Sequence, residues 1–554
     1  MNKRDQFIGE CIDYTHDGLG VVKHDNTTIF VKNLLLHETA KIEIIKVLKS
    51  YCVGRVVELQ TPSIRRIEPK CDCFKQCGGC SLMHMSDQEQ QSFKTNRVKE
   101  TFLKIAHQDL RVNDCLMDQD PYHYRNKVQV PFGMQDGQIV SGFYKARTND
   151  IINNDYCLIQ NEFSNKVIKR IKELFEKYHI QPYDKITKTG NIKHVLTKTS
   201  YHKNEAMVVF ISYKKKIPHI HEIIDTLTHE YPEIRTIIQN INSRHDNVIL
   251  GEEEKVLYGE GYIEDTLLGN TYKISMKSFY QINPRQVEVL YSKAIEYAKF
   301  KPTDVVIDAY CGIGTISLTL AKHVKKVYGV EVVPQAIVDA KENAERNHIT
   351  NAEFVCDDAG HFMTEFVERN EKVDCVMVDP PRKGCSTEFL ERLTTLSPER
   401  IVYISCNVAT QARDLTYLVE KGYKPIDVQP VDMFPHTPHI ETVVLLSHKK
   451  ADSYIHIDVE FGEGEGKIPV DSIAKRAEAY KPKEKVTYKM IKEYIEAKYG
   501  FKVHTAYIAE VKRNLGLPMY DAPNAVEELK QPRKHPTPEK VEAIKDALRY
   551  FAVI

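Results

Sequence analysis

The sequence predicts a multidomain α/β protein, and three observations lead to this fold class. The chain has 554 residues, which is too long for a single compact core. Short β-rich runs separated by turn residues fill residues 6–60 and predict a small barrel. From residue 276 onward, apolar strand-like runs alternate with helical stretches, which is typical of a doubly wound, mostly parallel sheet.

Four domains follow from these patterns. Residues 1–66 are expected to form a five-stranded barrel of the OB type, a fold that often binds oligonucleotides, with a purely structural cap as the alternative. Residues 67–275 mix strands with one amphipathic helix, NEFSNKVIKRIKELFEKYHI, and predict an α+β central domain. Within it, the stretch near 91–120 is expected to pack on the next domain. Residues 276–449 form the Rossmann-like domain, and residues 450–554 form a C-terminal extension.

Composition limits the possible classes of function. The chain is 42% hydrophobic and 28% charged, and no apolar run approaches the ~18 residues that a membrane span needs. The opening residues, MNKRDQFIGECIDY, lack the apolar stretch of a secretory signal, so a cytoplasmic location is expected. The 13 cysteines then predict reduced thiols, metal ligands or nucleophiles rather than disulfides. A net charge of zero neither favours nor excludes nucleic acid, because an average over several domains hides local patches.

The first turn of the Rossmann-like domain predicts a cofactor site. An apolar strand ends at Asp308, and Gly312 and Gly314 then open a helix, where glycines let a ligand approach the backbone closely. Glu331 ends the next strand, where it can accept hydrogen bonds from ribose hydroxyls. A dinucleotide site would need a third glycine where this chain has Ser317, so S-adenosylmethionine is favoured over NAD. Two more acids end later strands and are expected to face the same crevice: Asp358 and Asp379. For any one of these acids, a helix cap is the alternative.

A cysteine at the end of a further strand suggests covalent chemistry. In RIVYISCNVATQARDL the strand runs into Cys406, which should face the same crevice as Asp379. A thiolate that adds to C6 of uracil makes C5 nucleophilic enough to take a methyl group. An unperturbed thiol has a pKa of ~8.5, so the site is expected to lower this pKa, with Arg382 and Lys383 as candidate cationic neighbours.

Such a reaction also requires a base that removes the C5 proton, so that the thiolate can be eliminated. The segment VDMFPHTPHIETVVLL supplies Glu441 after a rigid turn and before a final strand. From the residues alone, Glu441 is preferred over two neighbouring candidates, His436 and His439.

A cysteine cluster in the central domain predicts a metal site. Cys71, Cys77 and Cys80 have the spacing C-x5-C-x2-C, and Cys157 can be the fourth ligand. Four thiols suit either zinc or an iron–sulfur cluster, and their spacing does not separate the two. Cys73 lies in the same loop and is interpreted as a spectator.

Together these motifs carry a resemblance. SFYQIN (278–283), DAYCGIGT, DPPRKG, YISCN.AT.ARDL and MFPHT.HIE occur in the order found in the RNA (uracil-5-)-methyltransferase family. Residues 1–447 resemble most its 23S ribosomal RNA branch. The resemblance implies that Cys406 is the nucleophile and Glu441 the proton acceptor. It also implies S-adenosylmethionine contacts from Gln281, Tyr310, Glu331 and Asp379.

The resemblance further implies a TRAM-type RNA-binding barrel and a [4Fe–4S] cluster on the four cluster cysteines, whose role would be folding rather than redox turnover. Both features favour ribosomal RNA, because the tRNA branch lacks them, and the target uridine would be flipped out of its RNA. No membrane and no DNA partner is expected.

The sequence leaves three alternative functions to compare with this one. One is methylation of the T-loop of tRNA by the same chemistry. Another is a non-catalytic RNA-binding iron–sulfur protein, which would have no use for Cys406, Glu441 and the cofactor acids. The third is an amino-type methyltransferase, for which a thiol is superfluous and which would have an aromatic residue where this chain has Arg382.

The extension opens with a glycine-rich linker, FGEGEGK, and predicts helix–turn–helix over residues 486–517, with Thr505 capping the second helix. The side chains expected to face inward are Ile491, Tyr494, Ile495, Ile508, Val511 and Leu515. Between Lys475 and Arg513, 11 Lys or Arg stand against 5 Asp or Glu, which permits a phosphate-contacting module. A helical packing appendage is the alternative. Residues 523–538 predict a spacer before a last helix.

Overall fold

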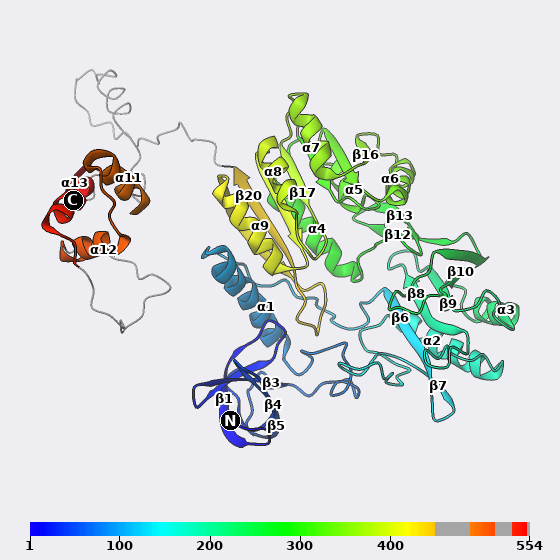
Figure 1. Cartoon of the computed structure of the whole chain (residues 1–554). Helices are drawn as coiled ribbons and strands as arrows, with labels where there is room; N and C mark the ends of the chain where they lie inside the picture. Colours follow the sequence, from blue (N-terminus) through cyan, green and yellow to red (C-terminus); the bar gives the residue numbers. More distant parts are fainter. Residues whose placement is uncertain (449–487, 516–534, 551–554) are drawn as a thin grey trace, which may run out of the picture. The chain divides into compact units, whose positions relative to one another are not determined.

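The structure is a computed structural model that describes residues 1–448, 488–515 and 535–550 (Figure 1). The chain divides into two compact units, Met1–Ser453 and Tyr454–Ile554. The predicted glycine-rich linker and most of the predicted spacer over 523–538 lie outside the described residues. Within the described residues, no helix combines the length and the apolar character needed to cross a membrane.

The first five strands close into a barrel with the order β1-β2-β3-β5-β4, which confirms the predicted five-stranded barrel. They are β1 (Gln6–Tyr14), β2 (Gly20–His24), β3 (Thr27–Lys32), β4 (Thr39–Val47) and β5 (Cys52–Thr61). A side chain at Gly54 would place its Cβ 2.6 Å from the Ile42 side chain, so only glycine fits this part of the barrel core. Arg66, just beyond the barrel, donates two 2.6 Å hydrogen bonds to the buried Glu38 carboxylate and so fixes the exit of the chain.

The central domain is built on a mixed six-stranded sheet with the order β11-β10-β9-β8-β6-β7. Its strands are β6 (Lys127–Gln135), β7 (Gln138–Ser141), β8 (Ile192–Thr199), β9 (Ala206–Ser212), β10 (Ile234–Ile241) and β11 (Glu253–Tyr258). Helices α2 (Glu162–Lys177) and α3 (Ile220–Glu230) bury their apolar stripes against it, which explains the helical periodicity of the sequence there. A hairpin of β12 (Tyr262–Leu267) and β13 (Asn270–Ser275) leads to the last domain of this unit.

That domain is a seven-stranded sheet with the order β16-β15-β14-β17-β18-β20-β19. The strands are β14 (Val305–Ala309), β15 (Lys326–Glu331), β16 (Ala352–Cys356), β17 (Cys375–Val378), β18 (Arg400–Ser405), β19 (Tyr423–Val431) and β20 (Glu441–His448). The first five strands in this order are parallel, and β20 runs antiparallel between β18 and β19. The predicted doubly wound, mostly parallel sheet is therefore confirmed.

Helices cover both faces of this sheet (Figure 1). One face carries α4 (Pro284–Ala298), α5 (Thr315–Ala321) and α6 (Pro334–Arg346). The other carries α7 (Ala359–Glu368), α8 (Thr387–Leu396) and α9 (Val408–Glu420). Because both faces are covered, the central strands are continuous apolar runs, as the sequence shows for VVIDA and CVMV.

A segment from the N-terminal half of the chain joins this second face. Helix α1 (Asp87–Thr101) and the π-helical turn η1 (Phe102–Ala106) contact α9. The chain that follows bridges to β19 at Val112 and Leu116. The ammonium group of Lys94 pairs with Asp432, and both side chains are fully buried. Such a pair strongly fixes α1 against the chain beyond β19, since separating the partners would leave a charge buried alone.

In the second unit, α11 (Tyr488–Tyr499), α12 (Thr505–Asn514) and α13 (Pro538–Tyr550) share a small apolar core. Asp546 on α13 accepts hydrogen bonds from Tyr494, Lys498 and Tyr499 on α11. Ile491, Ile495, Ile508 and Val511 are buried as predicted.

Two predictions for this unit are wrong. Leu515 is 39% exposed, because it follows the last turn of α12 and no longer lies on its inner face. The cap of α12 is His504, whose ring nitrogen accepts from the Ala506 N–H at 3.2 Å, so Thr505 is the first helical residue instead.

Candidate active site

Cys406 and Glu441 emerge opposite each other on neighbouring strands. β18 and β20 are antiparallel, with Ser405 paired to Thr442, so the next position in the register sets Cys406 opposite Glu441. Gln411 locks the two strand ends together, donating to Tyr403 O at 2.9 Å and accepting from the Thr442 hydroxyl at 2.5 Å. Sequence alone could not give this register, because 35 residues separate the end of β18 from the start of β20.

The surroundings of Cys406 act against the thiolate form. Burial, followed by the charges of Glu441 and Asp379, raises the pKa of the Cys406 thiol to about 11. The guanidinium of Arg382 opposes them through its charge and a hydrogen bond. The expected lowering of this pKa is therefore wrong for the structure as it stands, because burial and two carboxylates outweigh one cation. Lys383, the other cation considered, is exposed and is not among the groups that shift this pKa.

Glu441 is a buried carboxyl group with a strong affinity for a proton. It is 4% exposed, and burial followed by the charge of Asp379 raises its pKa well above the usual value, against the pull of Arg382. Burial also raises the pKa of Asp379 to about 7. A carboxylate with a raised pKa accepts a proton more readily from carbon than an exposed one does.

Neither of the two histidines predicted as alternative bases is among the main groups that shift the pKa of Cys406. His436 is 1% exposed and contacts Gln90 and Tyr122, away from the groups that act on Cys406. His439 is exposed at the surface, and partial desolvation together with the charge of Arg382 lowers its pKa. Glu441 is thus the titratable group that faces Cys406 most directly.

The loop that carries Arg382 is fastened to α9. Asn407 and Thr410 donate to the carbonyl of Arg382 at 2.9 and 3.3 Å. Asp414, fully buried, accepts from the Cys385 N–H at 2.8 Å. These anchoring residues were not singled out from the sequence, although a signal was present: positions 407, 410 and 414 are spaced three and four apart and so share one helix face.

The glycine loop after β14 has the strained geometry of a ligand cradle. Tyr310, Gly312 and Gly314 all have positive φ, at 68°, 56° and 85°. For a tyrosine this conformation is costly and is commonly kept at binding sites. Ser317 donates to the fully buried Asp308 at 2.5 Å, and burial raises the pKa of Asp308 to about 7. The serine that replaces a dinucleotide-type glycine thus has a structural partner of its own.

The remaining acids differ in what they do. The Glu331 carboxylate accepts from the N–H groups of Gly312 and Val333 at 3.3 and 3.0 Å, which places it at the mouth of the glycine loop. Asp358 caps α7 by accepting from the N–H groups of Gly360 and His361. Asp358 is therefore a helix cap, and because both hydrogen bonds use Oδ1, this role does not exclude a cofactor contact by Oδ2.

Gln281 reaches this crevice through a residue that sequence reasoning missed. Its side chain hydrogen-bonds the hydroxyl of Tyr291 on α4, and that hydroxyl lies 3.3 Å from Thr315 Oγ1. Burial, and then the charge of Asp379, raises the pKa of Tyr291. An aromatic residue inside an amphipathic helix gives no sequence signal beyond core packing, which is why Tyr291 was not singled out.

The cluster cysteines are electrostatic neighbours. Burial raises the pKa of the Cys80 thiol, and the charges of Cys157, Cys77 and Cys71 raise it further. The backbone N–H of Gly79 donates to Cys77 Sγ at 3.3 Å. Cys73, interpreted as a spectator, also lies close to this group, since burial and then the charges of Cys71 and Cys77 raise its pKa.

The positions of these sulfurs do not separate zinc from an iron–sulfur cluster. A tetrahedral site with Zn–S bonds of ~2.3 Å would bring its sulfurs about 3.8 Å apart. Among the described residues, no three cysteine sulfurs lie within 4.8 Å of one another, so the thiols are not gathered around one point in this structure. The backbone N–H that donates to Cys77 Sγ suits a thiolate ligand of either group, so the donor set fits both.

Residues 86–449 match the tRNA (uracil-5-)-methyltransferase family. An RNA methyltransferase of Clostridium tetani is 46% identical over 78% of this chain and 94% of its own length. One from Oceanobacillus iheyensis is 45% identical over 81% of this chain and 98% of its own. The chain belongs to the RNA uracil-5-methyltransferase family.

A solved structure agrees with this assignment. The tRNA (uracil-54, C5)-methyltransferase of Pyrococcus abyssi, in complex with S-adenosyl-L-homocysteine, is similar with a TM-score of 0.62 and 26% identity. The similarity covers 79% of this chain and 99% of that one. This uracil-5-methyltransferase therefore has the fold of an S-adenosylmethionine-dependent methyltransferase, and its family acts on RNA. The shared length also means that the architecture alone does not decide between ribosomal and transfer RNA.

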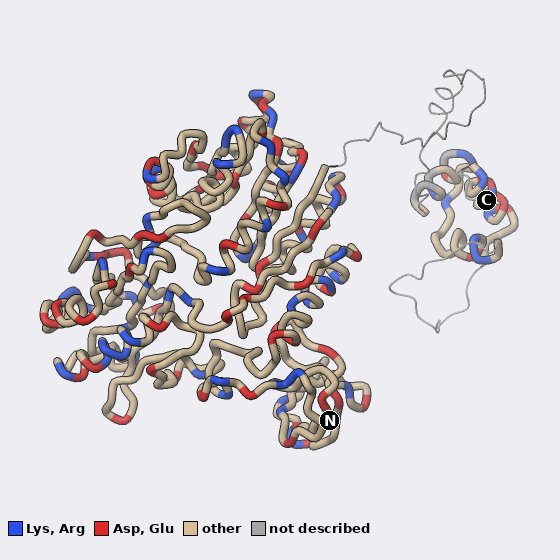
Figure 2. Tube along the Cα trace, turned by 180° about the vertical axis from the view of Figure 1, so that it is seen from behind, with Lys and Arg blue, Asp and Glu red and all other residues tan. Residues whose placement is uncertain are grey.

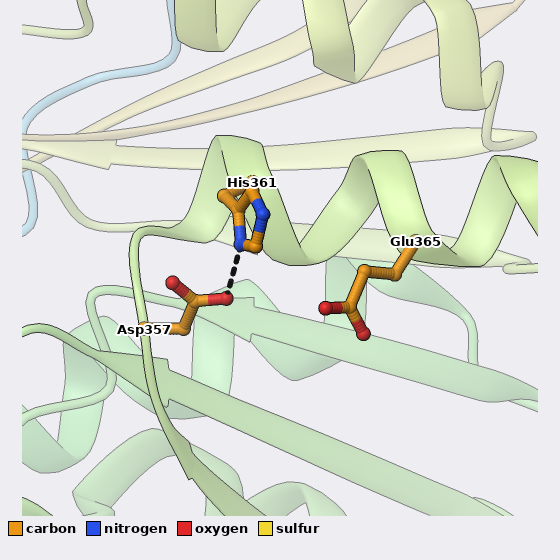
Figure 3. A group of neighbouring side chains, drawn as sticks. All are labelled: Asp357, His361 and Glu365. Atoms are coloured by element: carbon orange, nitrogen blue, oxygen red, sulfur yellow. Dashed lines mark hydrogen bonds and ion pairs between the residues drawn. The ribbon is translucent and has the colours of Figure 1, made fainter.

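One further group of possible ligands lies on the surface of the methyltransferase domain. Asp357, His361 and Glu365 place their ligand atoms within 4.8 Å of one another at the start of α7 (Figure 3). The 2.7 Å contact between Asp357 Oδ2 and His361 Nδ1 raises the pKa of His361. An exposed ion pair one helical turn apart accounts for this arrangement without a metal.

Proposed function

We propose that this enzyme methylates C5 of a uridine in 23S ribosomal RNA, with Cys406 as the nucleophile and Glu441 as the base. The observation that carries this proposal is the register between β18 and β20, which sets a thiol and a buried carboxyl group face to face in a uracil-5-methyltransferase.

The steps follow from what each side chain can do. The thiolate of Cys406 bonds to C6 of the flipped-out uracil, and C5 gains the electron pair of the former double bond. When bound, S-adenosylmethionine would give its methyl group to the electron pair on C5 and leave as S-adenosylhomocysteine, and its sulfonium charge would favour the thiolate. Glu441 then takes the proton from C5, the double bond re-forms, and the bond from Cys406 to C6 breaks to return the thiolate. Arg382 stabilises the anionic forms of both side chains.

We assign the cofactor to the crevice at the carboxyl ends of the parallel strands. The proposed contacts are Gln281, Tyr310, Gly312, Gly314, Glu331, Asp358 and Asp379. Support comes from the strained glycine loop, from the position of Glu331 at its mouth and from the link between Gln281 and Tyr291.

We further propose that Cys71, Cys77, Cys80 and Cys157 hold a [4Fe–4S] cluster. Methyl transfer moves no electrons, so such a cluster would serve folding and the shape of the RNA surface. The family resemblance implies that these thiols favour ribosomal RNA, whereas the barrel does not discriminate, because a tRNA enzyme is similar over 79% of this chain. Transfer RNA remains the second candidate, because the similar solved structure from Pyrococcus abyssi is a tRNA enzyme. Lys and Arg alternate with Asp and Glu over the first unit, so charge distribution does not decide the matter (Figure 2).

The test uses transcripts of 23S RNA and of tRNA in which 5-fluorouridine replaces uridine. Fluorine at C5 cannot leave as a proton, so the covalent adduct should accumulate and shift the protein on a denaturing gel. A shifted band that requires S-adenosylmethionine and forms only with ribosomal RNA is the expected result. A band with tRNA alone would keep the chemistry and replace the substrate. Cys406→Ala should abolish the band, whereas Cys52→Ala, at a thiol of the barrel far from the strand ends that form the crevice, should retain it.

A further inference from the structure

The turn that delivers Glu441 to the active site is held by parts of the chain that lie more than 300 residues away in sequence. This turn, residues 434–439, links the chain beyond β19 to Glu441 at the start of β20. It contains two prolines and a buried histidine, His436, with a left-handed φ of 64°. A non-glycine residue in that conformation persists only where its surroundings enforce it.

The loop that carries the clustered cysteines, residues 71–85 (the cysteine loop), supplies one side of this support. The N–H groups of Ser81 and Leu82, the two residues after Cys80, both donate to the carbonyl of His436 at 3.0 Å. Tyr124, which lies beside Cys80 and Cys157, donates its hydroxyl to Pro435 O at 3.3 Å.

Helix α1 supplies the other side. Gln90 accepts from the His436 N–H at 3.2 Å, and its amide nitrogen lies 3.4 Å from His436 Nδ1. The same amide donates to Met85 O at 3.0 Å, so Gln90 ties the turn to the end of the cysteine loop. Lys94 and Arg97, one and two turns further along α1, donate to Phe434 O and Pro438 O.

We propose that Gln90 and His436 are positioning residues for Glu441: they hold the turn so that its carboxylate reaches the C5 proton of the substrate. This inference rests on the proposed function. It assigns His436 a role other than that of a base. The cysteine loop then supports proton removal through the backbone contacts of Ser81 and Leu82, in addition to any part in RNA binding.

The reaction offers a readout that a general loss of fold would not give. Formation of the Cys406–C6 bond and methyl transfer to C5 precede proton removal, and only proton removal needs Glu441. A displaced Glu441 therefore leaves the first two events intact and delays elimination, so methylated uridine stays bonded to Cys406. On ordinary uridine RNA such a protein accumulates a covalent adduct that the normal enzyme resolves.

The experiment compares Gln90→Met with Gln91→Met in the full-length protein. Gln90→Met removes both polar contacts to His436 at similar side-chain volume. Gln91 is the matched control, because its amide donates to Cys115 O at 2.9 Å and does not touch the turn. The RNA is the transcript that gives the unaltered protein a 5-fluorouridine adduct.

With Gln90→Met we expect turnover on ordinary RNA to fall about 10- to 100-fold, as a misplaced catalytic group does. The adduct on ordinary RNA should accumulate, while the rate of 5-fluorouridine adduct formation stays within about threefold of normal. Gln91→Met should match the unaltered protein in all three measurements. Normal turnover by Gln90→Met, or no adduct on ordinary RNA despite slow turnover, would overturn the proposal.

His436→Gly keeps the test decisive if Gln90→Met fails to fold. Glycine adopts a positive φ without strain, so this variant loses the ring but not the backbone conformation. It should likewise show slow turnover on ordinary RNA and near-normal formation of the 5-fluorouridine adduct. Equal loss of both would count against the inference. If the unaltered protein itself gives no 5-fluorouridine adduct with any RNA tested, the proposed function has failed instead.

Discussion

A thiol and two carboxyl groups lie together at the ends of β17, β18 and β20. Asp379 raises the proton affinity of both Cys406 and Glu441, Glu441 raises that of Cys406, and Arg382 lowers it for Cys406 and Glu441. In this arrangement the anionic forms compete, because ionising one group makes ionising the next more costly. Since burial and the two carboxyl groups raise the pKa of Cys406, its thiolate population at neutral pH depends on the opposing charge of Arg382.

Replacing Arg382 by Ala should move the reactivity of Cys406 to higher pH. Loss of the cation raises the pKa of Cys406 and of Glu441 together, so less thiolate exists at any given pH. We expect the rising limb of kcat/KM to shift upward by about one pH unit, with a loss of about tenfold near pH 7.5. The pH dependence of thiol alkylation by iodoacetamide measures the same shift directly.

Lys383→Ala is the matched control for this prediction, since the two residues are adjacent and both exposed. Lys383 is not among the charges that act on Cys406, so its alkylation profile should stay unchanged. An unshifted profile in Arg382→Ala would mean that another group sets the thiolate population.

At the scale of elements, α9 acts as the frame of the active-site loop. Asp414 is its central residue: besides the Cys385 N–H, its carboxylate accepts from the Tyr403 hydroxyl at 2.6 Å and from the guanidinium of Arg413. Three donors around one buried carboxylate form a fully satisfied network, which is rigid and loses much when one partner changes.

Asp414→Asn should weaken both stability and activity. The amide that replaces one oxygen faces an N–H or O–H donor, which costs about 1–3 kcal/mol of unfolding free energy. The loop of Arg382 loosens as well, so methyl transfer should fall while the 5-fluorouridine adduct forms more slowly. Urea unfolding and adduct kinetics measure the two effects.

The control is Tyr403→Phe, which removes one donor and keeps the carboxylate. It should cost about 1 kcal/mol of unfolding free energy and leave adduct formation near normal. Equal effects from both variants would contradict this role for Asp414.

The cysteine loop makes a separate prediction at this scale. With a [4Fe–4S] cluster, protein purified without oxygen should contain about four iron and four sulfide per chain. Cys80→Ser should lose most of both, because it removes the ligand whose neighbours are the other three thiols. Cys73→Ser should retain them if Cys73 is a spectator. Zinc in place of iron, or loss of iron in Cys73→Ser, would show that the ligand assignment is wrong.

Many of the strands and their connecting turns could be predicted from the sequence, for physical reasons that can be named. Strands buried on both faces are apolar throughout, so β14, β17 and β18 can be recognised in the sequence. The turn residues that follow them mark the position of the crevice. The barrel was also predictable from its alternating β-rich runs. What the sequence could not show were partnerships across long separations, such as Lys94 with Asp432, because composition alone places a lysine at the surface. Two further features could not be predicted for the same reason: the register that sets Cys406 opposite Glu441, and the role of Tyr291.

At the scale of the whole molecule, the chain consists of a unit shared with its relatives and a unit that they do not cover. The relatives from Clostridium tetani and Oceanobacillus iheyensis are matched over 94% and 98% of their lengths by 78% and 81% of this chain. The family match ends at residue 449, close to the boundary between the two compact units. The second unit has an apolar core of its own on α11, α12 and α13.

A protein ending at Ser453 should therefore fold and keep its chemistry. Every residue proposed for catalysis, cofactor binding and the cysteine cluster lies before that point, and the relatives have little beyond it. With saturating 5-fluorouridine RNA, its adduct should form within about twofold of the full-length rate, and its unfolding transition should be retained.

The RNA affinity of the shortened protein at low and high salt then separates the two interpretations of the second unit. A loss of affinity that fades as salt rises would indicate phosphate contacts from its basic side chains, since counterion release makes such contacts salt-dependent. Unchanged affinity would indicate a helical appendage without a role in RNA binding, and loss of the adduct itself would show that the catalytic unit does not end where the family match ends.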